Sequence, residues 1–173
     1  MKLTWFGSRC FRIHAGGQIV VIEADAAPAG IDRTELLGGA DHAVNFGDPP
    51  PADARTWRAR PAQRLLDAGT TARPMGIWSA GPEAVLLDAD GEAPLLLAAG
   101  ELPALGKWAG NAVIVLCGAD MAQRGQALLE AHSPRLLALA GSDEAIETAF
   151  EALRDQLDGT GLVALEAGLA VEA

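Results

Sequence analysis

The last third of the chain alternates apolar strand patterns with helical patterns, and this alternation constrains the fold most strongly. Residues 111–117 (NAVIVLC) and 135–140 (RLLALA) are short apolar runs, typical of strands buried on both faces. Residues 121–131 and 143–157 show helical spacing, and Ser142 stands at the N-cap position of the second helix. The order strand, helix, strand, helix predicts a βαβα unit.

The first half is rich in hairpin signals. Residues 3–7 and 10–14 are expected strands around a Gly-Ser turn, and the pair Gly16-Gly17 predicts a turn into a strand at 18–23. The other predicted elements are a helix at 32–37 capped by Asp32, strands at 42–46, 73–78, 84–88 and 95–99, a helix at 61–67 and a final strand at 161–171. Hairpins followed by βαβα predict an α/β (α+β) protein with mixed sheets and outer helices.

The length and net charge of the chain limit the classes of protein to which it can belong. A chain of 173 residues suits one domain with a real core. The formal net charge of −10 makes nucleic acid and anionic membranes poor partners, because phosphate binding needs clustered Lys and Arg. No apolar run reaches the roughly 18 residues that a spanning helix needs, and no signal-peptide pattern is present. We therefore expect no membrane insertion and a cytoplasmic location.

Cysteines, tryptophans and one arginine cluster have structural explanations. Cys10 and Cys117 lie in apolar, strand-like surroundings and are expected to be buried free thiols. Trp5, Trp57, Trp78 and Trp108 are expected to be packing residues, the alternative being a ligand cage, and Trp57 and Trp108 are candidates for an interface patch. Arg55, Arg58, Arg60 and Arg64 are expected on a surface helix, the alternative being an anion site.

The first 24 residues, MKLTWFGSRCFRIHAGGQIVVIEA, resemble the opening of the metallo-β-lactamase-fold hydrolases. In the branch that includes sugar-lactone-phosphate hydrolases, that opening is roughly M-K-x-T-W-x-G-H-S-C-F-R-I-x-x-G-G-x-x-x-L-I-D-P. Ser8 stands where the family has a His, and Glu23 stands at its Asp. The resemblance implies a four-layer αββα sandwich, here a shortened single domain over residues 1–173, and a zinc site.

The main metal-binding loop of the family, A-D-x-V-L-V-T-H-x-H-x-D-H, has a degenerate and shorter counterpart here. When Gly47 is aligned with the residue between the first two His, Phe46 and Asp48 stand at these two ligand positions. Pro50 and Pro51 then stand at the Asp and the last His of the motif. Neither Phe nor Pro can bind a metal through its side chain.

Two later motifs are altered in the same way. Residues 80–102 follow the family stretch G-G-x-x-G-F-V-I-E-x-D-G-K-x-I-Y-x-A-G-D-T, with Glu101 at the bridging Asp ligand. Residues 136–141 resemble the motif V-I-P-x-H-Y, but Gly141 ends the segment and its His ligand is absent. A catalytic zinc needs about three His, Asp, Glu or Cys ligands, so zinc is implied by the family and no cofactor is expected from these residues.

The resemblance therefore implies a metallo-β-lactamase-like protein that has lost its activity and acts as a binding or assembly subunit, with a protein partner or as a homo-oligomer. The alternative is a metal-dependent hydrolase of a small phosphorylated or lactone-like substrate. Its rebuilt site would bring Asp48, Glu101 and His42 within about 5 Å of one another. A third possibility is an anionic small-molecule binder, with Arg58 or Arg73 lining a cleft at Glu101.

Overall fold

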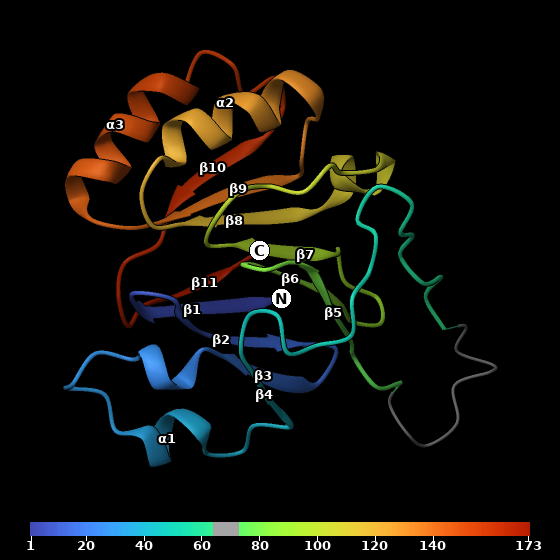
Figure 1. Cartoon of the computed structure of the whole chain (residues 1–173), viewed down its shortest axis with the longest axis vertical. Helices are drawn as coiled ribbons and strands as arrows, with labels where there is room; N and C mark the ends of the chain where they lie inside the picture. Colours follow the sequence, from blue (N-terminus) through green and yellow to red (C-terminus); the bar gives the residue numbers. More distant parts are fainter. Residues whose placement is uncertain (64–72) are drawn as a thin grey trace.

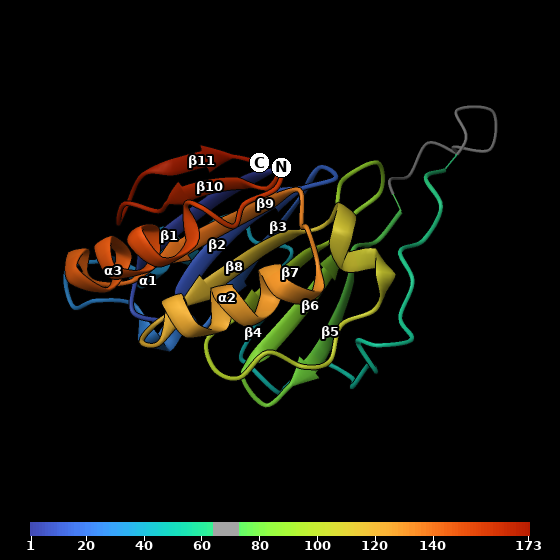
Figure 2. The same cartoon turned by 90° about the horizontal axis from the view of Figure 1, so that it is seen from above.

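The computed structural model describes residues 1–63 and 73–173, and within them the chain forms two mixed β-sheets and three α-helices. One sheet has five strands in the order β11-β1-β2-β3-β4, and the other has six in the order β10-β9-β8-β7-β6-β5. Figures 1 and 2 show the two sheets and their helices from two directions. The α/β class and the two mixed sheets predicted from the sequence are confirmed.

The elements have the following bounds. The five-stranded sheet contains β1 (Lys2–Gly7), β2 (Cys10–Ala15), β3 (Gln18–Ile22), β4 (His42–Val44) and β11 (Ala170–Glu172). The six-stranded sheet contains β5 (Gly76–Gly81), β6 (Ala84–Asp88), β7 (Leu95–Ala98), β8 (Val113–Cys117), β9 (Leu136–Ala140) and β10 (Gly161–Ala164). The helices are α1 (Arg33–Leu37), α2 (Met121–Ala131) and α3 (Asp143–Leu153), with short 3₁₀ turns at Ala24–Ala26 and Lys107–Asn111.

The main core lies between the two sheets. Phe11 and Ile13 of β2 meet Leu97 of β7 and Val115 of β8 in one buried cluster. Successive side chains of a strand point to opposite faces, so Ile114 of β8 belongs to a second cluster on the outer face of its sheet. This is why the central strands are apolar throughout and do not alternate.

Helices cover the outer faces of both sheets. Leu128 of α2 and Leu153 of α3 are buried in the outer cluster of the six-stranded sheet. Leu36 of α1 packs on Cys10 and Val21, on the outer face of the five-stranded sheet. Figure 1 accordingly shows α2 and α3 at one end of the molecule and α1 at the other.

Many predicted boundaries are confirmed, and some are wrong. Residues 84–88 form β6 as predicted, and the side chain of Ser142 accepts the N–H of Ala145 as an N-cap should. The strand predicted at 73–78 lies at Gly76–Gly81, and α3 ends at Leu153 instead of residue 157. The helix predicted at 61–67 falls largely on residues 64–72, which lie outside the described residues.

The single strand predicted at 161–171 is wrong. The segment forms two strands in different sheets, β10 beside β9 and β11 beside β1. Gly168, at φ 82°, lies in the turn between them, and its N–H donates to the carbonyl of Trp5. The turn carries the chain across the sandwich, which a continuous apolar pattern does not predict.

The burial predicted for the cysteines and the packing predicted for the tryptophans are confirmed, and the helix predicted for the arginine cluster is wrong where the structure describes it. Cys10 and Cys117 are free and buried, as expected. The rings of Trp78 and Trp108 both make edge-to-face contacts with the ring of Trp57, which confirms their packing role. The surface helix expected for the arginine cluster is wrong for Arg55, Arg58 and Arg60, which lie in an irregular segment, while Arg64 is outside the described residues. None of the described helices is long and apolar enough to cross a membrane.

Candidate functional site

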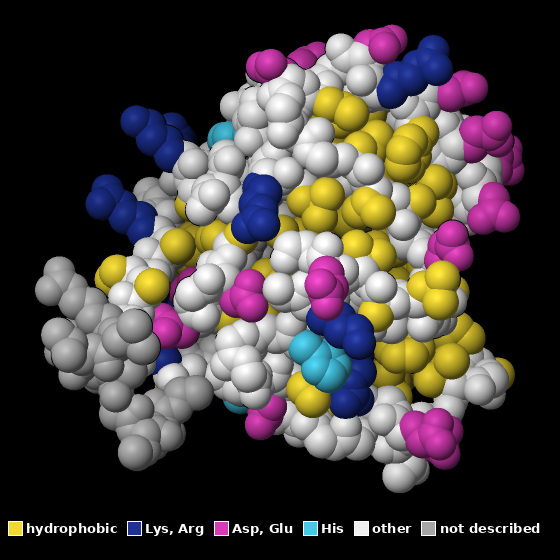
Figure 3. All heavy atoms as spheres, turned by 180° about the vertical axis from the view of Figure 1, so that it is seen from behind, with side chains coloured by type: hydrophobic (Ala, Val, Ile, Leu, Met, Phe, Trp, Pro, Cys, Tyr) yellow, Lys and Arg dark blue, Asp and Glu magenta, His cyan; other side chains and the backbone are white. Residues whose placement is uncertain are grey.

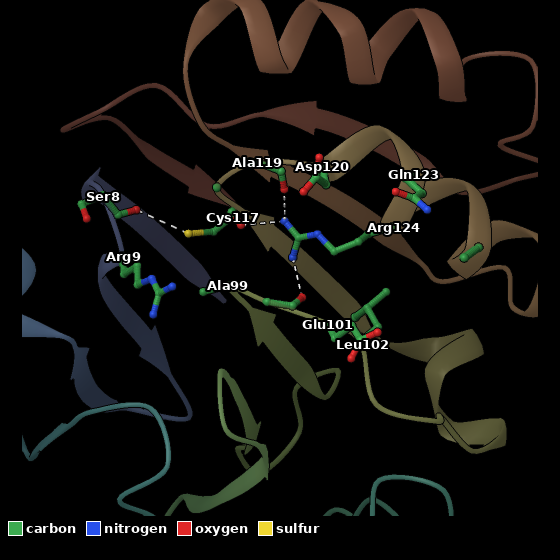
Figure 4. A pocket seen from close by; sticks show the side chains of 13 residues that line it. Ser8, Arg9, Ala99, Glu101, Leu102, Cys117, Ala119, Asp120, Gln123 and Arg124 are labelled. Carbon is green, nitrogen blue, oxygen red and sulfur yellow. Dashed lines mark hydrogen bonds between the residues drawn. The ribbon is translucent and has the colours of Figure 1, made fainter.

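A pocket of about 680 Å³ opens where β7 and β8 end. These neighbouring strands are parallel, so their carboxyl ends meet at one edge of the sheet, a common position for binding sites in α/β proteins. The turn between β1 and β2 contributes the other side of the pocket (Figure 4). The lining residues are Ser8, Arg9, Ala99, Gly100, Glu101, Leu102, Cys117, Gly118, Ala119, Asp120, Gln123, Arg124 and Ala127.

Arg124 holds the strand ends of this pocket together. Helical side chains lean toward the N-terminus of their helix, so Arg124 of α2 reaches back to the end of β8. Its Nη1 donates to the carbonyls of Gly100 at 2.7 Å and Ala98 at 3.3 Å, and its Nη2 donates to those of Cys117 at 2.7 Å and Ala119 at 2.8 Å. One guanidinium therefore serves carbonyls at the ends of both strands, and burial lowers its pKa.

A second arginine and two carboxylates complete the charged lining. Arg9 forms an ion pair with Glu83 in the turn between β5 and β6. Glu101 and Asp120 are exposed at the pocket. Asp120 precedes α2 with a left-handed φ of 57°, and its side chain does not cap the helix. The pocket thus presents two cations and two anions and has no net excess of negative charge.

Cys117 is a buried donor at the pocket and not an activated nucleophile. Its thiol donates to the carbonyl of Ser8 at 3.4 Å, and the indole of Trp5 donates to the same carbonyl at 3.0 Å. Burial raises the pKa of the Cys117 thiol from 9.0 to about 11, and the nearby Arg124 only partly opposes this. A thiol with such a pKa stays protonated at neutral pH, which argues against nucleophilic or metal-binding chemistry.

Phe46, at the first mapped ligand position, is used for packing. Its side chain packs, half-buried, against the core between the sheets. Its backbone N–H donates to the carboxylate of Glu23 at 2.8 Å, and the N–H of Glu23 donates to the carbonyl of Val44 at 3.0 Å. Hydrogen bonds of Glu23 to the backbone of Val44 and Phe46 therefore anchor the start of the loop that follows β4.

The prolines of the degenerate loop hold it against β5. The carbonyl of Pro50 accepts the N–H of Ser79 at 3.0 Å, and Pro51 forms an isolated parallel bridge with Ser79. Both proline side chains are exposed. Residues 50 and 51 thus form an edge contact for the six-stranded sheet.

The three residues of the rebuilt-site hypothesis are held in different surroundings. Asp48 accepts from the backbone and side-chain nitrogens of Asn45 at 3.3 and 2.9 Å, so its carboxylate closes its own turn. His42 lies on β4, paired with Val20. Among these three, only Glu101 lines the 680 Å³ pocket.

The donor set does not fit a zinc ion. In residues 1–63 and 73–173, no three His, Cys, Asp or Glu side chains come together in a way that could hold a metal. Gly141, at the mapped position of the last ligand of the motif, has no side chain that could bind a metal. No step of a metal-dependent reaction can be derived from this geometry.

The comparisons with known proteins add no identity. No protein-family model, curated protein or solved structure matches this chain. The site must therefore be interpreted from its own geometry.

The two arginines of the pocket, Arg9 and Arg124, are not among the sequence-predicted site residues. Arg9 follows the mapped Ser8 directly, and Arg124 lies one turn into the helix that follows an apolar strand. A cation on the first turn of a helix is unfavourable for the helix dipole, and this was the available signal that Arg124 has another task. Arg58 and Arg73, which were considered for an anion cleft, do not line this pocket.

Proposed function

We propose that this chain is a shortened metallo-β-lactamase-like scaffold that has lost metal-dependent hydrolysis and acts by binding, as a subunit of an assembly. Two face-to-face sheets with helices on both outer faces support the fold part of the proposal. The ordered series of degenerate motifs supports the family part.

The observation that carries the functional part is the charge of the pocket at the ends of β7 and β8. A metal ion needs a cluster of anionic or imidazole ligands, whereas Arg9 and Arg124 line the pocket beside Glu101. Withdrawal of Arg124 would remove a charged donor from carbonyls at the ends of two strands. A divalent cation entering this space would meet two like charges, and the two carboxylates that also line the pocket, Glu101 and Asp120, are fewer than the ligands it needs.

The hydrogen bond between the carboxylate of Glu23 and the N–H of Phe46 also supports the loss of metal-dependent hydrolysis. Glu23 is a non-glycine residue at φ 52°, a conformation that costs energy and persists only when its surroundings require it. The main chain of the mapped loop is anchored, while three of its four mapped ligand positions carry Phe46, Pro50 and Pro51 and the fourth, Asp48, bonds within its own turn. This pattern is that of a loop with a structural role and no metal-binding role.

A hydrolysis assay tests the proposal. The protein, supplemented with zinc or manganese, is offered a chromogenic lactone, phosphomonoester and phosphodiester, beside the Glu101→Gln variant. We expect no hydrolysis that is sensitive to a chelator in either protein. Chelator-sensitive hydrolysis by the unaltered protein that the Glu101→Gln variant loses would establish the rebuilt hydrolase instead.

A further inference from the structure

A second cavity, of about 780 Å³, lies along the margin of the apolar face of α3, where the half-buried Ile146 and Phe150 border the buried Ala149 and Leu153. It is bounded by α3, by the end of β10 and by the end of β1. The lining residues are Trp5, Gly141, Asp143, Ile146, Glu147, Phe150, Ala164, Leu165, Glu166 and Ala167, which we call the α3 groove.

The α3 groove is open because the six-stranded sheet ends beneath it. β10 is an edge strand that pairs only with β9 in the described part of the chain. Ile146 and Phe150, one turn apart on α3, are therefore only half-buried. Gly141 adds no side chain to fill the space, so an apolar floor stays accessible.

The charges of the groove have one sign. Its three ionisable side chains, Asp143, Glu147 and Glu166, are all acidic and exposed. Leu169, which follows in the same turn region, is 56% exposed. Figure 3 shows hydrophobic side chains gathered on this face of the molecule with acidic side chains along their border. An accessible apolar patch with a polar border is typical of a protein-interaction site.

We propose that the α3 groove binds a segment of another protein that presents apolar side chains flanked by Lys or Arg. This inference rests on the proposed function, in which the chain acts by binding. Apolar side chains of the segment would pack on Ile146 and Phe150, and its cations would face Asp143, Glu147 and Glu166. A second copy of this chain is disfavoured as the occupant. If two copies packed groove to groove, the three carboxylates of one copy would lie against the three carboxylates of the other.

Three labelled peptides test the chemistry of the groove. The first is an amphipathic helix of Leu and Lys, the second replaces its Leu by Ser, and the third replaces its Lys by Glu. Fluorescence anisotropy at physiological salt should detect binding of the Leu/Lys peptide alone, because burial of apolar side chains and opposite charge are both required. Equal binding of the Ser/Lys peptide would overturn the proposal, since it would show attraction to net charge only.

Two matched double variants locate the binding. Asp143→Lys/Glu147→Lys reverses two groove charges, and Glu144→Lys/Glu151→Lys reverses two exposed charges of the same helix that do not line the groove. Both change the net charge equally, and each places one Lys in the first turn of α3. We expect the groove variant to lose about tenfold or more in affinity for the Leu/Lys peptide, while the control stays within about twofold.

Equal losses in the two variants would overturn the proposal. So would a dimer in sedimentation that the groove variant alone dissociates, because the occupant would then be a second copy. Neither result depends on metal content or hydrolysis. A hydrolytic activity would contradict the proposed function, whereas the peptide-binding measurements would still decide the proposal for the α3 groove.

Discussion

Arg124 donates to the main-chain carbonyl of Cys117 at 2.7 Å and thereby ties the first turn of α2 to the strand that precedes it. The same guanidinium reaches the carbonyl of Gly100 beyond β7. A side chain that serves several carbonyls in one place has a structural task, and it leaves a positive charge at the pocket.

Replacement of Arg124 should therefore destabilise the fold. We expect Arg124→Met to lower the free energy of unfolding by about 1–3 kcal/mol, because its carbonyl partners lose a donor. Gln123→Met, an exposed neighbour in the same pocket, should change it by less than about 0.5 kcal/mol. Urea unfolding measures both, and equal effects of the two changes would refute the structural task of Arg124.

The ion pair between Arg60 and Asp88 should be the strongest in the described part of the chain. The Asp88 side chain is 4% exposed, and its Oδ2 accepts from Nε of Arg60 at 2.6 Å. Arg60→Met should lower the free energy of unfolding by about 1–3 kcal/mol, because the buried carboxylate then keeps, among the described residues, only the backbone N–H of residue 60 as a donor.

The pair of Arg33 and Asp25 provides the control. Both side chains are more than half exposed, at 61% and 65%. Arg33→Met should cost less than about 1 kcal/mol, since water and salt screen an exposed pair. If thermal unfolding showed similar losses for Arg60→Met and Arg33→Met, the burial of Asp88 would not matter in the way described.

The buried thiols should make stability depend on alkaline pH. Burial raises the pKa of both Cys10 and Cys117 from 9.0 to about 11. Between about pH 9 and 11 the unfolded chain releases these protons while the folded chain keeps them, so the free energy of unfolding falls as pH rises. Below pH 9 both states are protonated, and the thiols add no slope.

Unfolding curves across this range, with and without Cys10→Ala/Cys117→Ala, measure the thiol contribution. The chain has no tyrosine, and Lys2 and Lys107 are exposed, so few other groups disturb the comparison. The double variant should lose stability less steeply between pH 9 and 11. An unchanged slope would mean that the thiols are more accessible than their burial indicates.

Gly125 marks close contact between α2 and α3. A Cβ there would lie 2.7 Å from Cδ1 of Leu153, which is fully buried. Gly125→Ala should lower the free energy of unfolding, because overpacking of about 1–3 kcal/mol exceeds the gain of about 1 kcal/mol in helix propensity.

A double-mutant cycle with Leu153→Ala isolates that contact. The combined variant should be more stable than the sum of the single losses predicts, since the new methyl enters the space that Leu153 leaves. Simple additivity in urea unfolding would show that the two helices relax apart instead.

Local patterns predicted the sheets and caps well because the responsible forces are local. The apolar run of β6 and the N-cap Ser142 both act within a few residues. The division of residues 161–171 between two sheets was missed, because it depends on partners far away in the chain, β9 and β1. Glu166 and Gly168 are the local sign of a turn inside this segment, but they do not show that the two strands join different sheets.

For the candidate site, the sequence predicts only that several mapped positions lack metal-binding side chains. The sequence identifies Phe46 and the prolines as side chains without metal-binding atoms. It does not reveal that Arg124 binds carbonyls of β7 and β8, or that Arg60 reaches the buried Asp88. These contacts join residues that are distant in sequence, and a single charged side chain carries no sign of its partner.

The metal content of the purified protein decides whether this pocket has lost its metal ions. The protein is produced with added zinc and manganese, dialysed against metal-free buffer and measured by elemental analysis against its concentration. We expect substoichiometric metal, unchanged by Glu101→Gln, because two arginines line the pocket and the described residues offer no ligand cluster. One or two equivalents of metal that Glu101→Gln removes would contradict this expectation.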